Sequence, residues 1–309
     1  MELSVLVLGG ALALDLTLAE PPRRLHPVAW FGRLVGGVDR EWRHPRLVGA
    51  LAAAVLPVGA GTIVAGTVWT ASVVDPLAGT AVAALAVFVT TSLRRLLERV
   101  REVSSAAGTD LPAARDRLRA LAGRDASTLS AGEVRSAAVE SLAENLADGL
   151  VAPLMYYTVF AAGLTVAGIE PTVAVAAGCG AAAWAKGVNT LDSMLGYRST
   201  PTGWGPARLD DAAMWLPARA SAVLLAAVLG RPRALLAAHR WEGDLASPNS
   251  GWPMGALAAG LDIRLEKPGH YTLNADAPLP DADAAAAAVR RVALAGLLAY
   301  ALAGVVTWY

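Results

Sequence analysis

Long apolar runs constrain this chain more than any other feature of its sequence. Leu47–Val74 exceeds the roughly 20 apolar residues that a helix needs to cross a bilayer, and Leu77–Leu93 follows it after a tight Asp75-Pro76 turn. A spanning segment must satisfy its own backbone hydrogen bonds, as a helix does. The sequence therefore predicts an all-α integral membrane protein.

The composition agrees with this prediction. Of 309 residues, 55% are hydrophobic and 17% are charged, whereas soluble domains carry roughly 25% charged residues. The net charge is zero, so no global basic field indicates nucleic acid as a partner. The lone cysteine, Cys179, excludes an internal disulfide and a thiolate metal site, and we interpret it as a packing residue.

About five helices are expected to cross the membrane. The candidate segments are Leu3–Ala19 (marginal), Leu47–Val74, Leu77–Leu93, Leu150–Ile169, Thr172–Val188 and Val292–Tyr309. Ala212–Gly230 differs because Pro217 and Arg219 leave an apolar run too short to span. We expect a re-entrant or interfacial helix there, with a further span as the alternative.

Basic residues indicate the orientation. They gather in four long polar segments, Arg23–Arg46, Arg94–Arg135, Lys186–Arg208 and Arg231–Arg291. The positive-inside rule places such segments in the cytoplasm. We therefore expect a multi-pass cell-membrane protein whose N-terminus is outside. Residues 1–309 would form a single membrane domain, with a cytoplasmic helical insertion at 94–149 and cytoplasmic loops at 189–211 and 231–291.

The insertion carries helix signals. Asp110 is placed to cap one helix, and Ser130 with Glu133 forms a capping box that opens the next. This second helix is expected to run to Asp148, with Gly149 just beyond its end.

On this helix, three acidic residues recur at i, i+4 and i+8. Glu140, Glu144 and Asp148 would form one stripe, with Asn145 on the adjacent row. Like charges at this spacing repel, and acids near a helix C-terminus oppose the helix dipole. A magnesium ion carried with phosphates would relieve both. The alternative is a solvated acidic face.

A second polar group follows the Thr172–Val188 segment. Lys186, Asn189 and Asp192 lie at helical spacing near the membrane boundary. Burial of ionisable groups there is costly and is usually retained for function, so we expect Lys186 to bind phosphate or carboxylate oxygens. The alternative is a snorkelling lysine at a polar helix end.

Two further segments are candidates. Arg208, Asp210, Asp211 and Arg219 form a mixed group that would suit a metal–phosphate complex, although an aspartate of this pair could instead cap the following helix. The turn-rich loop from Ser247 through Asn249 to Trp252 is either a substrate loop or an ordered structural turn.

Five blocks in one order resemble the CobD/CbiB family of adenosylcobinamide-phosphate synthases, membrane enzymes of cobalamin biosynthesis. The blocks are LDLTLAEPPRRLHPVAWFGRLV, VESLAENLADGLVAPLMYY, KGVNTLDSMLGYR, GPARLDDAAMWLPAR and SPNSGWP. The resemblance covers nearly the whole chain. Departures fall at Glu20, where Asp is usual, at Leu245-Ala246, where many relatives have His-Pro or similar, and at Met254.

The resemblance implies an ATP- and magnesium-dependent ligase. It would join the corrinoid carboxylate of adenosylcobyric acid to aminopropanol or its O-phosphate, giving adenosylcobinamide or its phosphate. The matching positions are Glu140, Glu144, Asn145 and Asp148, then Lys186, Asn189 and Asp192, then Arg208, Asp210 and Asp211, then Ser247, Pro248 and Asn249.

We assign roles to these residues as hypotheses. The expected catalytic residues are Glu140, Glu144, Asp148, Asp192, Asp210 and Asp211, of which Glu140, Glu144 and Asp148 would hold magnesium. The expected substrate-binding residues are Asn145, Lys186, Asn189, Arg208, Arg219, Ser247 and Asn249.

Two other functions stay open. A transporter would also place charges near helix ends, but the sequence has no inverted repeat and its polar motifs lie on one expected side of the membrane. A non-catalytic membrane subunit that binds a corrinoid is the second. A homo-oligomer is compatible with all three, and the lipid bilayer is a partner in each.

Overall fold

The computed structural model describes residues 2–122, 125–197, 200–245 and 247–308. Ala246, one of the departures from the family pattern, and Tyr309, the end of the last expected span, lie outside these ranges. The chain forms two compact units. The first unit comprises Met1–Ser92, Asp148–Met214 and Ala299–Tyr309, and the second comprises Leu93–Ala147 and Trp215–Leu298.

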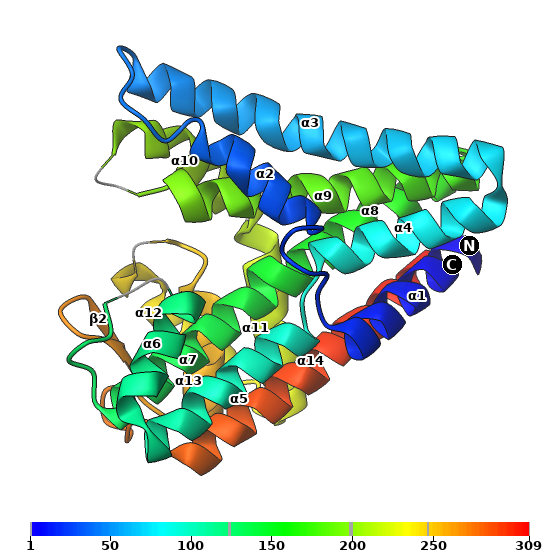
Figure 1. The fold of residues 1–309 in the computed structure, drawn as a ribbon. Coiled ribbons are helices and arrows are strands. Elements are labelled where there is room, and N and C mark those ends of the chain that lie inside the picture. The colour runs from blue at the N-terminus through cyan, green and yellow to red at the C-terminus, as the bar shows by residue number, and fades with distance from the viewer. Residues whose placement is uncertain (1, 123–124, 198–199, 246, 309) are drawn as a thin grey trace. The chain divides into compact units, whose positions relative to one another are not determined.

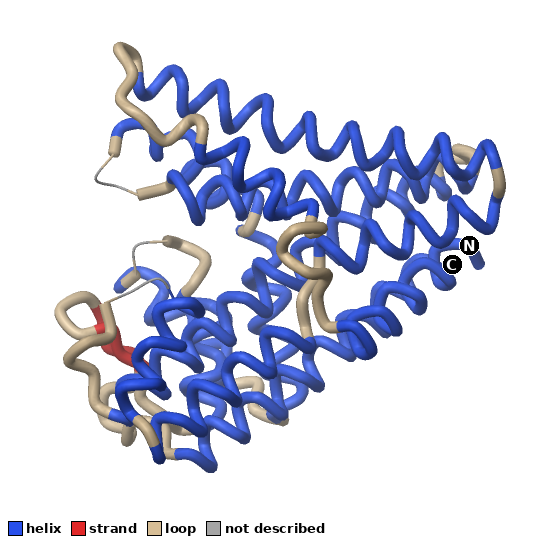
Figure 2. The backbone as a smooth tube through the Cα atoms, in the orientation of Figure 1, coloured by secondary structure: helices blue, strands red, loops and turns tan. Residues whose placement is uncertain are grey.

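Helices make up almost all of both units (Figures 1 and 2). The first unit contains α1 (Glu2–Leu18), α2 (Pro27–Gly36), α3 (Pro45–Val74), α4 (Pro76–Thr90), most of the π-helix η1 (Ala147–Val151), α8 (Ala152–Val166), α9 (Pro171–Leu195), the short η2 (Pro201–Gly203) and α10 (Trp204–Ala213).

The second unit contains α5 (Arg94–Thr109), α6 (Leu111–Ala122), α7 (Ala131–Leu146), α11 (Trp215–Leu229), α12 (Ala234–Trp241), η3 (Glu242–Asp244), α13 (Gly251–Leu261), strands β1 (Leu265–Lys267) and β2 (Tyr271–Leu273), and most of α14 (Ala282–Trp308). The two strands pair antiparallel, with Leu265 opposite Leu273. This hairpin was not expected from the sequence.

Within the described residues, four helices are long and apolar enough to cross a membrane. They are Pro45–Val74, Pro76–Thr109, Ala131–Val166 and Ala282–Trp308, and Pro201–Ala213 with Trp215–Leu229 makes a fifth if it is one broken span. The predicted class, an all-α membrane protein with about five spans, is confirmed. Two expected spans, Leu3–Ala19 and Thr172–Val188, are not among these helices.

Small residues let α3 and α9 pack closely in the first unit. A Cβ atom on Gly61 would lie 2.7 Å from the Gly180 carbonyl oxygen, and one on Gly180 would lie 2.8 Å from the Gly61 carbonyl oxygen. Such small-residue contacts allow helix backbones to approach in a membrane. Cys179, next to Gly180, is fully buried, as a packing residue should be.

The expected end of a helix at Asp148 is wrong. The helix continues through η1 into α8, so Ala131–Val166 is one helical stretch. A π-helix leaves carbonyl groups outside the usual i to i+4 ladder. Here the Gly149 carbonyl accepts a hydrogen bond from the Ser92 backbone N–H at 2.9 Å, so a tertiary partner stabilises the widened turn where the sequence suggested a stop.

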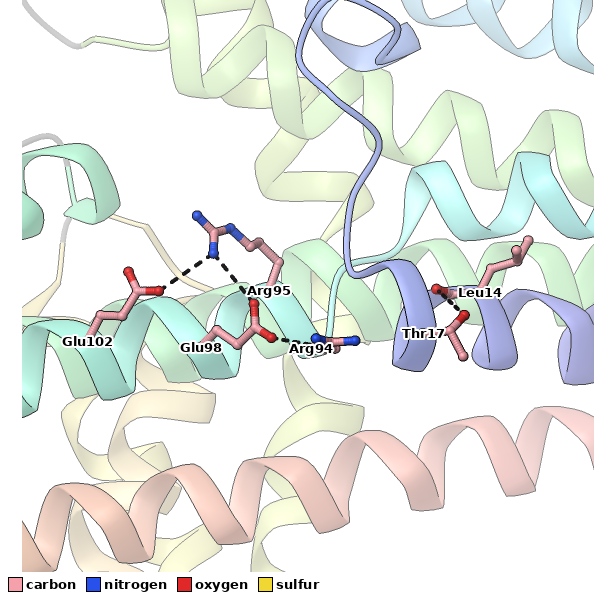
Figure 3. Close-up of polar contacts among 6 residues, drawn as sticks. All are labelled: Leu14, Thr17, Arg94, Arg95, Glu98 and Glu102. Carbon is pink, nitrogen blue, oxygen red and sulfur yellow. Dashed lines mark hydrogen bonds and ion pairs between the residues drawn. The ribbon is translucent and has the colours of Figure 1, made fainter.

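The other helix signals of the insertion are confirmed. Ser130 and Glu133 form the predicted capping box, and Asp110 accepts a hydrogen bond from the Ala113 N–H at 3.1 Å. On α5, Glu98 pairs with Arg94 at 2.7 Å and with Arg95 at 3.5 Å (Figure 3).

Candidate functional site

Five charged side chains of the first unit form one cluster, called here the charged cluster. They are Asp148 on η1, Lys186 and Asp192 on α9, and Asp210 and Asp211 on α10. The Asp148 carboxylate interacts electrostatically with Lys186 and Asp192. Asp210 interacts with the three other aspartates. Five of the predicted site residues thus form one set of interacting charges, although they come from three separate parts of the sequence.

Asp210 is the most deeply buried member. Its side chain is 8% exposed, and its Oδ1 atom is buried without a hydrogen-bond partner among the described residues. A buried carboxylate is costly unless a cation or hydrogen-bond donor compensates it. Asp210 lies inside α10 rather than before a helix, so the capping alternative for the Asp210–Asp211 pair is wrong.

Backbone contacts hold α10 in place. A Cβ atom on Gly205 would lie 2.7 Å from the Cα atom of Ala50 on α3, so only glycine allows this approach. The Tyr156 hydroxyl on α8 donates a hydrogen bond to the Ala213 carbonyl at 3.0 Å. The aspartates of α10 are therefore fixed against spanning helices rather than carried on a free loop.

Lys186 also faces the first loop of the chain. It lines a pocket of about 70 Å³ together with Pro27, Phe31 and Thr190, and it interacts electrostatically with Glu20. Glu20 accepts a hydrogen bond from the Ser92 hydroxyl at 3.2 Å. Lys186 therefore has carboxylates near it, whereas its binding of phosphate or carboxylate oxygens and the snorkelling alternative both stay predictions.

Two other predicted residues lie at the edge of the cluster. The exposed Arg208 pairs with Asp211 at 3.4 Å, an arrangement that contributes little to stability at a surface. Asn189 is half-buried one turn beyond Lys186, and its backbone carbonyl accepts a hydrogen bond from Ser193 at 2.8 Å.

Glu140 belongs to a different network, in the second unit. It is fully buried and accepts hydrogen bonds from the Tyr271 hydroxyl at 2.6 Å and the Ser136 hydroxyl at 2.9 Å. Ser136 in turn accepts one from the Glu266 N–H at 2.8 Å. These contacts connect α7 to the β-hairpin, and they exclude a solvated acidic face at Glu140.

The other residues of the acidic stripe belong to different units. Glu144 and Asn145 are half-buried on α7, and the Asn145 amide donates to the Ser141 carbonyl at 2.9 Å. Asp148 follows in η1, within the first unit. No group of three or more metal-ligand side chains occurs among the described residues. Magnesium binding by Glu140, Glu144 and Asp148 stays a prediction.

Arg219 is the centre of a second network, called here the arginine clamp. Its guanidinium lies 4.2 Å from the Trp215 ring centroid and 4.9 Å from that of Trp252. It donates to the Asn249 side-chain oxygen at 3.2 Å and pairs with Glu242 at 3.6 Å. The guanidinium therefore contacts two indole rings, an amide oxygen and a carboxylate.

The Ser247–Trp252 loop is fixed by the clamp. Asn249 is 4% exposed, and its N–H donates to the Ser247 hydroxyl at 3.3 Å. The Trp252 indole N–H donates to Glu242 at 2.5 Å. The loop is an ordered structural turn, whereas its contact with a substrate stays a prediction.

Sequence reasoning missed Ser136, Tyr271, Glu242 and Trp215. Tyr271 contacts Glu140 across 131 sequence positions, and no local pattern reports such a pair. Trp215 lies within the GPARLDDAAMWLPAR block but was given no role, and Glu242 lies outside all five blocks.

The chain is similar to known proteins over almost its whole length. The family described as CobD/Cbib protein matches residues 8–301. The chain belongs to this family. A relative from Methanothrix thermoacetophila, named "Probable cobalamin biosynthesis protein CobD", is 35% identical over 96% of this chain and 94% of the relative. One from Rhodobacter capsulatus, "Cobalamin biosynthesis protein CobD", is 35% identical over 93% of each chain. One from Mycobacterium tuberculosis with the same name is 36% identical over 84% of this chain and 79% of the relative. No solved structure matches the chain.

Proposed function

We propose that the protein is an ATP-dependent amide ligase of cobalamin biosynthesis. It joins the side-chain carboxylate of adenosylcobyric acid to the amine of aminopropanol or of aminopropanol O-phosphate. Two findings support this: family membership over nearly the whole chain, and the charged cluster of the first unit. The cluster carries the proposal because it assembles four acids and one lysine from three separate family motifs.

The reaction needs an activated carboxylate. The corrinoid carboxylate takes a phosphoryl group from ATP, and the amine then displaces phosphate to form the amide. Phosphoryl transfer depends mainly on positioning and on neutralising charge. Lys186 binds phosphate oxygens, and Arg208 at the open edge of the cluster adds a second cation. Asn189 orients the bound substrate from the next turn of α9.

Magnesium fits the acids of the cluster. It usually binds through one or two carboxylates together with substrate phosphates, so a cage of three protein ligands is not required. The Oδ1 atom of Asp210, which has no hydrogen-bond partner among the described residues, would fit such a ligand, and Asp148, Asp192 and Asp211 lie within electrostatic range of it. Magnesium would supply charge neutralisation on the transferred phosphate, and these aspartates would hold it.

The test is product formation by the purified full-length protein in lipid nanodiscs. The reaction contains ATP, magnesium, adenosylcobyric acid and either aminopropanol or its O-phosphate, and mass spectrometry detects the amide. Product must require ATP and magnesium together. Absence of product with both amine donors contradicts the proposal.

A matched pair of lysine variants sharpens the assay. The chain has only two lysines, Lys186 and Lys267, so Lys186→Ala and Lys267→Ala remove the same group from different places. We expect a loss of about 100-fold or more for Lys186→Ala and little change for Lys267→Ala. Equal activities would remove Lys186 from the reaction.

Two further assays of the purified protein distinguish the ligase from the two other functions. A transporter would move corrinoid across a sealed vesicle without ATP-dependent amide formation. A corrinoid-binding subunit would bind adenosylcobyric acid and release it unchanged. We further propose that the charged cluster faces the cytoplasm, where ATP is available. Labelling of an Arg208→Cys variant from outside intact cells would contradict that orientation.

A further inference from the structure

A basic pocket lies at the C-terminal end of α11, and none of its described lining residues is assigned to the ligase reaction. It has a volume of about 480 Å³, and its lining residues are Gly230, Arg231, Pro232, Arg233, Ala234 and Ala259. Both arginine side chains are exposed, and none of the described residues that line the pocket is acidic. The pocket therefore presents two guanidinium groups to a ligand, and guanidinium matches phosphate geometry well.

Hydrogen bonds to the terminal carbonyl groups of α11 reduce the negative charge next to the pocket. A helix C-terminus carries partial negative charge, which would repel phosphate. Here Arg291 from α14 donates to the Val228 carbonyl at 2.9 Å, and Gly230 turns the chain with φ +65° so that the Arg231 N–H reaches the Ala226 carbonyl at 3.0 Å. Two of the terminal carbonyls are thus satisfied, one of them by a third guanidinium.

An uncovered apolar stripe on α11 leads to this pocket. Leu216 and Val223 are each 54% exposed, and Ala227 is exposed on the same face. From Leu216 to Gly230 a helix rises about 21 Å, more than the roughly 15 Å of one leaflet of the hydrocarbon core. The stripe is therefore long enough to lie along a lipid acyl chain.

We propose that this surface binds an anionic phospholipid. The phosphate lies between Arg231 and Arg233, and an acyl chain lies along Leu216 and Val223. An amphipathic ligand explains both features together, because a soluble anion would leave the apolar stripe unused and a zwitterionic lipid would leave the arginine pair uncompensated. Basic pockets at the ends of membrane helices bind anionic headgroups in this way.

The test measures lipid retention by native mass spectrometry of the detergent-purified full chain. The probes are phosphatidylglycerol, phosphatidylcholine with the same acyl chains, and glycerol phosphate, which has the anion without the chains. We expect phosphatidylglycerol to bind about tenfold more tightly than either other probe. Equal binding of the two lipids, or of glycerol phosphate and phosphatidylglycerol, would overturn the proposal.

Two variants with equal charge change decide where the lipid binds. Arg231→Gln with Arg233→Gln should weaken phosphatidylglycerol binding about tenfold. Arg101→Gln with Arg117→Gln, on exposed positions of α5 and α6, should leave it unchanged. A third variant, Leu216→Ser with Val223→Ser, should weaken binding of the lipid but not of glycerol phosphate. Unchanged lipid binding in the first or the third variant contradicts the proposed site.

Discussion

The charged cluster and the arginine clamp contain similar residues but use them differently. In the clamp, two indole rings, an amide and a carboxylate surround the Arg219 guanidinium. In the cluster, Asp148, Asp192 and Asp211 interact electrostatically with Asp210, and Lys186 interacts with Asp148. An oxygen atom of Asp210 is buried without a hydrogen-bond partner among the described residues. The clamp is complete within the protein, whereas the cluster has more negative charge than its own cation balances.

This difference separates a structural role from a ligand-binding role. A buried polar group whose partners are all present stabilises the fold. Like charges held together cost free energy, and proteins retain such costs mainly at functional sites. Replacing a residue of the cluster should therefore lower activity without lowering stability, whereas replacing a residue of the clamp should lower stability.

The largest effect on activity is expected for Asp210→Asn. This change keeps the shape but removes the negative charge, so ligase turnover should fall about 100-fold. Stability should stay equal or rise, because a buried, unpaired carboxylate is costly. Steady-state product formation and thermal unfolding in nanodiscs measure both quantities.

The control for this variant is Asp116→Asn, at an exposed position of α6. It makes the same chemical change outside the family motifs and should alter neither quantity. If Asp210→Asn destabilises the protein while turnover is unchanged, Asp210 belongs with the clamp rather than with a ligand site.

Arg219→Gln should produce the reverse pattern. It removes the stacking on Trp215 and Trp252 and leaves Glu242 with fewer partners, so the free energy of unfolding should fall by about 2 kcal/mol. Arg219→Lys keeps the charge but not the planar group, and it should restore only part of the loss. Chemical denaturation in micelles provides the comparison. Full rescue by lysine would show that charge alone matters at this position.

Tyr271→Phe tests the Glu140 network. Removing this hydroxyl takes one hydrogen-bond donor from a buried carboxylate, at a cost of about 1–3 kcal/mol. In a double-mutant cycle, Glu140→Gln and Tyr271→Phe should be coupled, because the two side chains are in contact. The magnesium dependence of turnover should be unchanged in Tyr271→Phe. A shifted magnesium dependence in Glu140→Gln alone would instead support the predicted metal role of Glu140.

The smallest expected effect is on the pH dependence of stability. His26 caps α2 by accepting a hydrogen bond from the Val28 N–H at 3.3 Å. Burial lowers the pKa of His26, and the nearby Lys186 lowers it further, although Glu20 acts in the opposite direction. The folded protein thus favours neutral His26. Its contribution to stability is present above the unfolded pKa of about 6.5 and is lost as the pH falls through the lower folded pKa.

The variant His26→Asn keeps a capping side chain but cannot titrate. Its thermal unfolding should lack the part of the acid-induced loss that His26 causes, which amounts to less than about 1 kcal/mol. If the two proteins lose stability in parallel between pH 7 and pH 5, protonation of His26 does not break the cap.

Much of the fold could be predicted because its signals are local. The length of apolar runs such as Leu47–Val74 reports membrane helices directly, and the Ser130–Glu133 capping box depends on four neighbouring residues. The helix end expected at Asp148 was wrong because Gly149 resembles a helix terminator in sequence. Its carbonyl instead pairs with Ser92, 57 positions away, which no local rule contains.

The candidate site could likewise be predicted only in part. The sequence by itself determined which residue types are present and that Lys186, Asp192, Asp210 and Asp211 lie in polar motifs beside apolar helices. Only the tertiary structure decided that these four form one charged cluster with Asp148, while Arg219 and Glu140 bind other side chains of the protein. The reason is physical: helical periodicity extends over a few turns, whereas charge compensation depends on side chains that close packing brings together from distant segments.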